Sequence, residues 1–244
     1  MKKKKKKRIS KKEKQKYIKI ASVSFVLLFI IVVLFANGLL KFKTNYNTLD
    51  CQVLLDAGHG GYDSGSIYQN IYEKDIALAL TLEIGEQLEN KGIKVGYTRI
   101  KDQSLGNDEG EDLKKRTLIA NQSNATFFIS IRTNASNHHN AKGFEVWYNE
   151  QSETLASIIE QHIGRLPYIY NRGMMNISKK PLYLIKYSNK KTILIEAGFL
   201  ESGHDREYLC NEMNRKAFAI EIANAIEMAL KNEGEWLWKI LYIL

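Results

Sequence analysis

The apolar positions of this chain fall into one long uninterrupted stretch and then a series of shorter patterns. The stretch Ile20–Leu40 contains no charged residue and consists mainly of Val, Leu, Ile and Phe. Its 21 residues match the roughly 20 that a helix needs to cross the hydrocarbon core of a membrane. The sequence therefore predicts one transmembrane helix at residues 20–40, followed by a polar linker at residues 41–50.

Beyond the linker, short apolar runs typical of buried strands alternate with longer patterns of helical period. The expected strands are Gln52–Leu55, Lys94–Thr98, Thr126–Ile131, Phe144–Tyr148, Leu182–Ile185 and Thr192–Ile195. The expected helices are Tyr72–Asn90, Asp112–Ser123, Ser152–Leu166 and His204–Lys231. Such alternation is typical of an α/β fold. We expect one domain at residues 51–232, with a mostly parallel or mixed sheet of about six strands and helices on both faces, preceded by the transmembrane helix.

The formal net charge of +9 comes from the N-terminus. Residues 1–19 hold 12 of the 36 Lys and Arg residues beside one acid, so the rest of the chain carries 24 bases against 26 acids. A basic segment before an apolar stretch is a signal of membrane topology, which argues against nucleic acid as a partner. Residues 1–19 are expected to be a cytoplasmic tail. The segment Leu34–Ala36 is a poor cleavage site, so we expect an uncleaved anchor with the domain outside the cell membrane.

Two further features leave alternatives open. The two cysteines, Cys51 and Cys210, are too far apart in sequence for a metal-binding spacing, and the sequence favours two buried thiols over one disulfide. The apolar tail at residues 233–244 is too short to cross a membrane. It is expected to pack on the domain, and the alternative is a position at the membrane interface, where Trp and Tyr are favoured.

Four side chains are expected to meet at one edge of the sheet. His59 lies in a glycine-rich turn after the first strand, and Glu73 opens the first helix. Arg132 and Glu196 end two later strands. The ends of parallel strands share an edge, where open α/β sheets place their chemistry. Taken singly, His59 is typical of a turn and Glu73 of a helix start, but Glu196 directly after Ile-Leu-Ile would be costly to bury without a partner.

With these residues in place, the chain resembles a known family over about Val53 to Leu230, namely the zinc-dependent N-acetylmuramoyl-L-alanine amidases in their type 3 catalytic-domain form. The matching segments are Asp56–Gly61 with Asp63 and Gly65, Glu73–Asp75, Arg116 with Ala120 and Asn121, Phe128–Ile131 with Asn134 and Ala135, Gly143–Tyr148, Asn171–Gly173 and Glu196–Leu200. Each segment alone is a weak signal, but so many in the right order make the resemblance specific.

The resemblance implies a zinc ion held by two histidines and one glutamate, with a second glutamate as catalytic base. By position, His59 and Glu73 would be ligands and Glu196 the base. Arg132 stands where the family has its second histidine ligand, and its guanidinium offers only hydrogen-bond donors. His138 and His139, a few residues further on, are the candidate substitutes. The candidate substrate contacts are Arg172, for a carboxylate, and Asn134.

Two functions from different classes follow. The first is a zinc hydrolase that cleaves the amide between N-acetylmuramic acid and the L-alanine of the peptidoglycan stem peptide. The second is a catalytically silent module that binds peptidoglycan or regulates its turnover, with the Arg132 guanidinium paired to Glu73 and Glu196 in place of the metal. A different metal site, built with His138 or His139, is a third possibility. In each case we expect a monomeric domain that residues 20–40 anchor in the membrane and that faces the cell wall. The resemblance adds a similarity to anchored members that act on the spore cortex.

Overall fold

In the computed structural model, the described residues are 49–136, 141–167, 169–178 and 180–241, together with Lys12, Lys14, Gln15 and Phe25. Side chains are described as far as residue 234. The expected anchor at residues 20–40 lies, except for Phe25, outside this part of the chain, as do His138 and His139. Among the described residues, no helix is both long and apolar enough to cross a membrane. Asn47–Leu244 form one compact unit.

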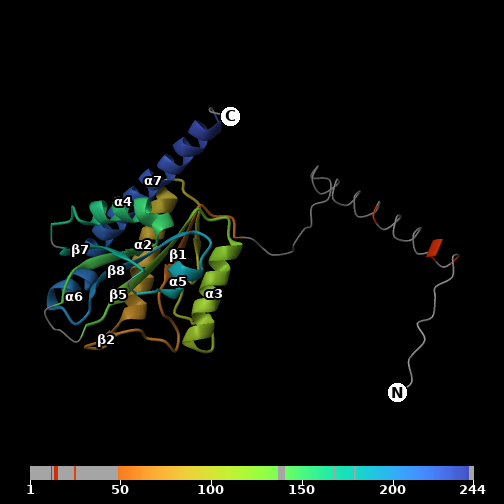
Figure 1. The fold of residues 1–244 in the computed structure, drawn as a ribbon. Coiled ribbons are helices and arrows are strands. Elements are labelled where there is room, and N and C mark those ends of the chain that lie inside the picture. The colour runs from red at the N-terminus through yellow and green to blue at the C-terminus, as the bar shows by residue number, and fades with distance from the viewer. Residues whose placement is uncertain are drawn as a thin grey trace, which may run out of the picture. The chain divides into compact units, whose positions relative to one another are not determined.

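A six-stranded sheet forms the centre of this unit (Figure 1). From one edge to the other, its strands are β4 (Val95–Tyr97), β1 (Val53–Ala57), β5 (Phe127–Asn134), β8 (Lys191–Phe199), β6 (Phe144–Tyr148) and β7 (Asn171–Asn176). All neighbouring strands are parallel except β6 and β8, which are antiparallel. The expected mostly parallel sheet of about six strands is therefore confirmed.

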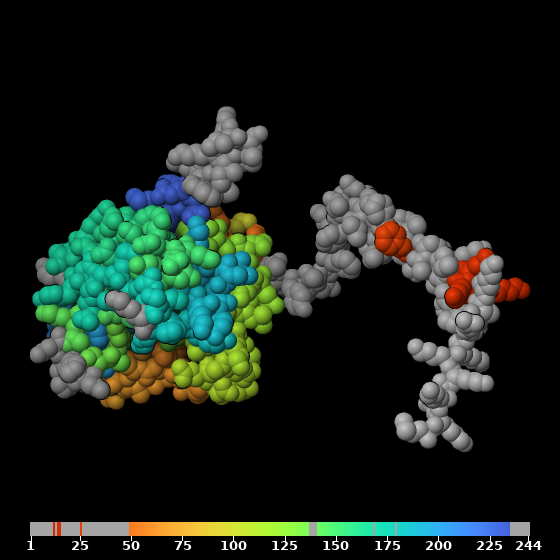
Figure 2. All heavy atoms as spheres, viewed as in Figure 1, coloured from red at the N-terminus to blue at the C-terminus, as the bar shows by residue number. Residues whose placement is uncertain are grey.

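Helices cover both faces of the sheet, as predicted. One face packs against α2 (Glu73–Asn90), α4 (Glu153–Ile163) and α7 (Glu212–Leu241), and the other against α3 (Glu109–Gln122) and α5 (Tyr183–Tyr187). The remaining elements are the hairpin β2 (Ile67–Tyr68) and β3 (Ile71–Tyr72), the 3₁₀ turn η1 (Glu150–Ser152) and the helix α6 (Gly203–Cys210). In Figure 2 the residues around α5 adjoin those of α3, and the Asn121 side chain donates to the Tyr187 carbonyl at 3.1 Å.

The core explains why the strands read as continuous apolar runs. Val53 and Leu55 point into the larger core with α2, α4 and α7, while Leu54 points into the smaller core with α3 and α5. All three side chains are fully buried. Successive strand residues face opposite sides of a sheet, so a sheet that is covered twice needs apolar residues at every position. This double cover leaves the strand ends as the place for polar chemistry.

Three predictions about elements were wrong. Leu182–Ile185 is not a strand: Leu182 precedes the short helix α5, in which Leu184 and Ile185 are buried. Pro181 explains the difference, because proline lacks the N–H that an inner strand needs and is tolerated where a helix starts. The sixth strand is instead β7, whose sequence Asn-Arg-Gly-Met-Met-Asn has no continuous apolar run because it is a partly exposed edge strand. The expected helix His204–Lys231 is divided at Asn211, whose extended ψ of 120° separates α6 from α7.

The two cysteines are both free thiols. Cys51 is buried beneath the smaller core, in agreement with the prediction, whereas Cys210 is exposed at the end of α6. The expectation of two buried thiols is thus wrong for Cys210. A disulfide is also excluded in this structure.

Candidate functional site

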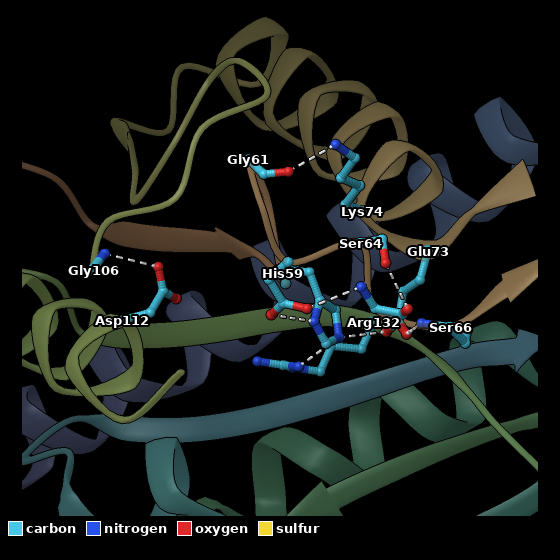
Figure 3. A network of polar contacts seen from close by, with 12 residues as sticks. His59, Gly61, Ser64, Ser66, Glu73, Lys74, Gly106, Asp112 and Arg132 are labelled. Carbon is cyan, nitrogen blue, oxygen red and sulfur yellow. Dashed lines mark hydrogen bonds and ion pairs between the residues drawn. The ribbon is translucent and has the colours of Figure 1, made fainter. Parts of the chain in front are cut away.

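The four side chains singled out from the sequence lie together at the edge where β1, β5 and β8 end. Figure 3 shows three of them, His59, Glu73 and Arg132. Arg132 and Glu196 are register partners on adjacent strands. His59 Nε2 lies 3.2 Å from Glu73 Oε1 and 2.9 Å from Arg132 Nη1. The expected convergence of distant segments is therefore present in the fold.

His59 is held in an unusual backbone conformation. Its φ is +58°, in the left-handed region that non-glycine residues seldom adopt. The next residue, Gly60, has a φ of +129°, and a Cβ there would lie 2.4 Å from the Gln103 carbonyl oxygen. Only glycine therefore fits at position 60, which accounts for the glycine that follows the histidine.

Two buried arginines bind the carbonyl groups of this turn. Arg99 donates to the Ala57 carbonyl at 2.9 Å and to the Gly58 carbonyl at 2.7 Å. Arg116 donates to the Ala57 carbonyl at 2.7 Å and to the His59 carbonyl at 2.6 Å. All three carbonyls are thus satisfied by guanidinium groups, which offsets the cost of the His59 conformation. Sequence reasoning had Arg116 only as a family match and missed Arg99.

A buried carboxylate lies beneath the turn and compensates the charge of Arg116. Asp56 accepts from Arg116 at 2.7 Å, from Thr98 at 2.6 Å and from Ser130 at 2.7 Å. Burial by itself raises the pKa of Asp56, but the charges of Arg116 and Arg132 and the hydrogen bonds from Thr98 and Ser130 together outweigh burial and lower this pKa to about 2. Asp56 is therefore a structural anion that anchors Arg116.

The ring of His59 is oriented by Asp63. Its Nδ1 lies 2.7 Å from Asp63 Oδ2, and the other oxygen of Asp63 accepts from the Gly65 N–H at 3.0 Å. Burial lowers the pKa of His59, but the hydrogen bonds to Glu73 and Asp63 outweigh burial and leave this pKa raised. Burial likewise raises the pKa of Asp63, and the Gly65 N–H and His59 reverse this to a net lowering. Nε2 of His59 consequently faces Arg132 and Glu73.

Glu73 is buried, and backbone amides engage both of its oxygens. Oε1 accepts from the Thr133 N–H at 2.9 Å, and Oε2 accepts from the Ser66 N–H at 3.0 Å. Burial raises the pKa of Glu73, but the contact with His59 and the Ser66 N–H leave it lowered. Glu73 is therefore ionised and already committed to protein donors.

Arg132 extends along the floor of the site. A Cβ on Gly58 would lie only 2.7 Å from Arg132 Cγ, so the missing side chain of Gly58 makes room for the arginine stem. Nη1 contacts His59, whereas the buried Nε has no hydrogen-bond partner among the described residues. A buried donor without a partner is costly, so this nitrogen is a point at which the site can accept a ligand atom.

Glu196 is the matching acceptor. Its buried Oε2 has no hydrogen-bond partner within the part of the chain that the structure describes. Burial, followed by the charge of Glu73, raises the pKa of Glu196 to about 7, although Arg132 opposes this shift. A cavity of about 190 Å³ opens beside it, lined by His59, Asp63, Glu109, Asp112, Leu113, Arg132, Leu182, Tyr183, Leu184, Leu194 and Glu196.

The described side chains do not fit a catalytic zinc ion. Such a site normally has three protein ligands and an open position. Within the described ranges, no group of three or more His, Cys, Asp or Glu side chains could hold a metal. The Nε2 lone pair of His59, which would have to ligate the metal, faces the Arg132 guanidinium instead.

The two expected substrate contacts meet at a carboxylate that the sequence analysis did not single out. Glu145 is buried on β6, directly opposite Glu196 on β8. It accepts from Arg172 Nε at 2.6 Å, from Asn134 Nδ2 at 3.1 Å and from Trp147 Nε1 at 3.0 Å. The available signal was its place in the segment Gly143–Tyr148, one strand away from Glu196.

Comparison with known proteins places this fold and site in a family. The sequence model described as N-acetylmuramoyl-L-alanine amidase matches residues 53–228. The uncharacterized protein YqiI of Bacillus subtilis is 31% identical over 180 residues, covering 72% of this chain and 82% of that protein. The germination-specific N-acetylmuramoyl-L-alanine amidase of B. subtilis is 27% identical over 199 residues, covering 75% and 81%. Among solved structures, the CwlD amidase of Clostridioides difficile, determined in complex with the GerS lipoprotein, has a TM-score of 0.69 at 33% identity, covering 74% and 98%.

Proposed function

Because the chain belongs to the N-acetylmuramoyl-L-alanine amidase family, we propose that its domain engages cell-wall peptidoglycan at the amide between N-acetylmuramic acid and L-alanine. Similarity to amidases over nearly the whole domain supports this substrate. The convergence of His59, Glu73 and Glu196 beside one cavity supports the same location for the site.

The contact between Arg132 and His59 carries the finer proposal, that the site binds this amide without zinc-dependent hydrolysis. The guanidinium places a permanent positive charge beside the lone pair that would ligate the metal. It also has a free buried donor, and Glu196 has a free buried acceptor. An amide carries one acceptor and one donor, so it can satisfy groups of both kinds.

Hydrolysis is the second candidate, and Glu196 favours it. A carboxylate with a pKa of about 7 beside a cavity suits a general base. In that case Glu196 accepts a proton from the attacking water and returns it to the leaving amine. Bound zinc would supply the polarisation of the carbonyl, but it would require Arg132 to leave His59 and a third ligand, and His138 and His139 lie outside the described residues.

The cellular setting is part of the proposal. The segment at residues 20–40 would anchor the chain, as a monomer, in the cell membrane, with the domain on the outer side. The germination-specific relative supports a role in spore-related wall remodelling. The structure of the CwlD amidase was determined in complex with a lipoprotein. We propose that this chain likewise has a partner protein at the cell wall.

The test is to incubate the detergent-solubilised full-length chain with purified peptidoglycan sacculi, with and without added zinc. Sedimentation measures binding, and mass spectrometry with labelling of new L-alanine amino groups measures cleavage. Binding without new amino groups is expected. Zinc-dependent release of L-alanine amino groups that is lost in Glu196→Gln would establish hydrolysis instead. If the chain neither binds the sacculi nor releases L-alanine amino groups, the proposed substrate is overturned.

A further inference from the structure

Glu145 organises a small polar cluster beside the cavity. Its side chain is 6% exposed and accepts from three donors, which lie on β5, β7 and its own strand β6. Both oxygens are therefore engaged, and their contacts fix the orientation of each donor. A buried carboxylate satisfied in this way is a rigid support for the side chains that surround it.

Arg172 is the member of this cluster that remains open toward solvent. Its Nε is held by Glu145 at 2.6 Å, and its guanidinium carbon lies 5.2 Å from the centre of the Phe199 ring. Its side chain is 39% exposed. Among the described residues, its two terminal nitrogens have no hydrogen-bond partner. The guanidinium is thus fixed by its inner nitrogen and one face, while the outer pair of nitrogens stays free.

The free nitrogens lie close to Glu196. Glu145 and Glu196 are directly opposite each other on antiparallel strands, which places their Cβ atoms about 5 Å apart. Adding the contact from Glu145 to Arg172, we place the guanidinium within roughly 10 Å of the Glu196 carboxylate. One residue of extended peptide spans about 3.5 Å. A stem peptide whose first amide lies at Glu196 can therefore bring a group on its second residue to Arg172.

We propose that Arg172, positioned by Glu145, binds a free carboxylate on the second residue of the stem peptide. This inference rests on the proposed function, because it takes the amide of L-alanine to lie at Glu196. The free pair of nitrogens matches the two oxygens of a carboxylate. The neutral amide of the same residue would place an N–H group against one of the two guanidinium nitrogens, so that two donors would face each other. The subsite therefore distinguishes an acidic stem peptide from an amidated one.

The experiment compares two probes in which the γ-carboxyl group of the second residue is blocked in an amide bond. One is N-acetylmuramoyl-L-alanyl-γ-D-glutamyl-L-alaninamide, whose α-carboxylate is free, and the other is the same compound with that carboxylate replaced by its neutral carboxamide. Calorimetry with the full-length chain measures both affinities, and mass spectrometry checks that the probes stay intact. The acid is expected to bind roughly tenfold more tightly, as a charge-assisted hydrogen-bond pair implies. Arg172→Gln should remove this preference by weakening the acid alone, leaving the amide within about twofold.

Two further variants separate recognition from general effects. Arg215→Gln is the matched control, because Arg215 also pairs with a carboxylate, Glu83, but joins α7 to α2. It should leave the preference for the acid intact. Glu145→Gln should reduce the preference in the unchanged chain and have no further effect on it in the Arg172→Gln chain. Circular dichroism identifies any variant that fails to fold, and Arg172→Met, which removes the charge but keeps a long side chain, then replaces Arg172→Gln.

The outcomes distinguish this inference from the proposed function. Equal binding of the two probes by the unchanged chain would overturn the carboxylate subsite and leave the proposed substrate in place. A preference for the acid that survives in the folded variant, Arg172→Gln or its replacement Arg172→Met, would also overturn it. Binding of neither probe would count against the subsite and the proposed substrate together.

Discussion

Arg132 Nη1 lies 2.9 Å from His59 Nε2, and this contact decides the state of the histidine. A guanidinium has only donors, so Nε2 must be the acceptor and the ring proton must lie on Nδ1, toward Asp63. The raised pKa of His59, which Glu73 and Asp63 cause, favours the protonated ring, whereas the contact with Arg132 requires the neutral one. The ring is therefore neutral, because a protonated ring would place two cationic donors against each other.

Arg132→His should create a zinc site. The substitution removes the guanidinium from Nε2 of His59 and adds the third ligand of a three-ligand site. We expect about one zinc per chain by elemental analysis after dialysis, against essentially none for the unchanged chain. Arg132→Gln is the control, since it removes the charge without adding an imidazole. Zinc in the unchanged chain at the same level would contradict the proposed silent site.

Glu196 should make stability depend on pH. Its pKa is raised from 4.5 to about 7, so between these pH values the folded chain keeps a proton that the unfolded chain has lost. The free energy of unfolding then falls as pH rises through this range. Glu196→Gln lacks this fall, so its stability relative to the unchanged chain should grow by up to about 3 kcal/mol from pH 4.5 to 7 and then stay constant. Urea unfolding across this range measures the difference.

Glu227 provides a control of opposite sign. Hydrogen bonds from Lys231 and Lys91 lower its pKa to about 2. Its ionised form therefore stabilises the folded chain above the ordinary pKa of 4.5, and this contribution disappears as pH falls toward 2. The stability of Glu227→Gln relative to the unchanged chain should therefore fall as pH rises from 2 to 4.5, and it should stay constant from pH 4.5 to 7. A gain in the relative stability of Glu227→Gln between pH 4.5 and 7, like that expected for Glu196→Gln, would show that the Glu196 effect is not local.

Arg116→Lys should destabilise the domain strongly. Lysine keeps the charge but cannot reach Asp56 and the Ala57 and His59 carbonyls together. Weakening a buried pair of this kind costs about 3 kcal/mol, measured as the free energy of unfolding in urea. Arg215→Lys, whose partner Glu83 is 3.2 Å away and partly exposed, should cost less than about 1 kcal/mol. Similar losses for both would argue against a special role for the turn carbonyls.

Gly58→Ala should be harmful because of Arg132. The added Cβ would lie 2.7 Å from Arg132 Cγ. It would also lie 3.1 Å from the Ile131 carbonyl oxygen, which leaves the added methyl group little room to move away. Overpacking of this kind costs about 1–3 kcal/mol. In an Arg132→Ala chain, which lacks the Cγ, the same substitution should cost clearly less. Equal costs in the two chains, measured by thermal unfolding, would show that Gly58 is needed for some other contact.

The two cysteines should differ in reactivity. Cys210 is exposed and Cys51 is buried, and burial raises the pKa of the Cys51 thiol. A thiol reagent should label one cysteine per native chain, at Cys210, and both after unfolding. Cys210→Ser should abolish the native labelling. Labelling of neither cysteine in the unfolded, unreduced chain would reveal the disulfide that the structure excludes.

The sequence by itself determined the parts of this protein that depend on local pattern. Runs such as Val53–Leu55 and Phe127–Ile131 predict buried strands because a sheet covered on both faces needs apolar side chains at every position. Gly60 and Gly61, which follow His59, predict the turn because glycine adopts positive φ angles at little cost. Parallel strand ends share an edge, so the meeting of His59, Arg132 and Glu196 also followed from the order of elements.

Only the tertiary structure decided which groups pair at that edge. The direction of the Arg132 guanidinium depends on the space above Gly58, and the cluster around Glu145 depends on the register of three strands. The strand β7 was missed because it lies at an open edge of the sheet and has no continuous apolar run. The segment of α5 was mispredicted as a strand because its short apolar pattern fits a strand as well as a buried helix. Hydrophobic periodicity encodes whether a segment is buried, but contacts between charges depend on angstrom-scale distances that arise only when distant segments have packed.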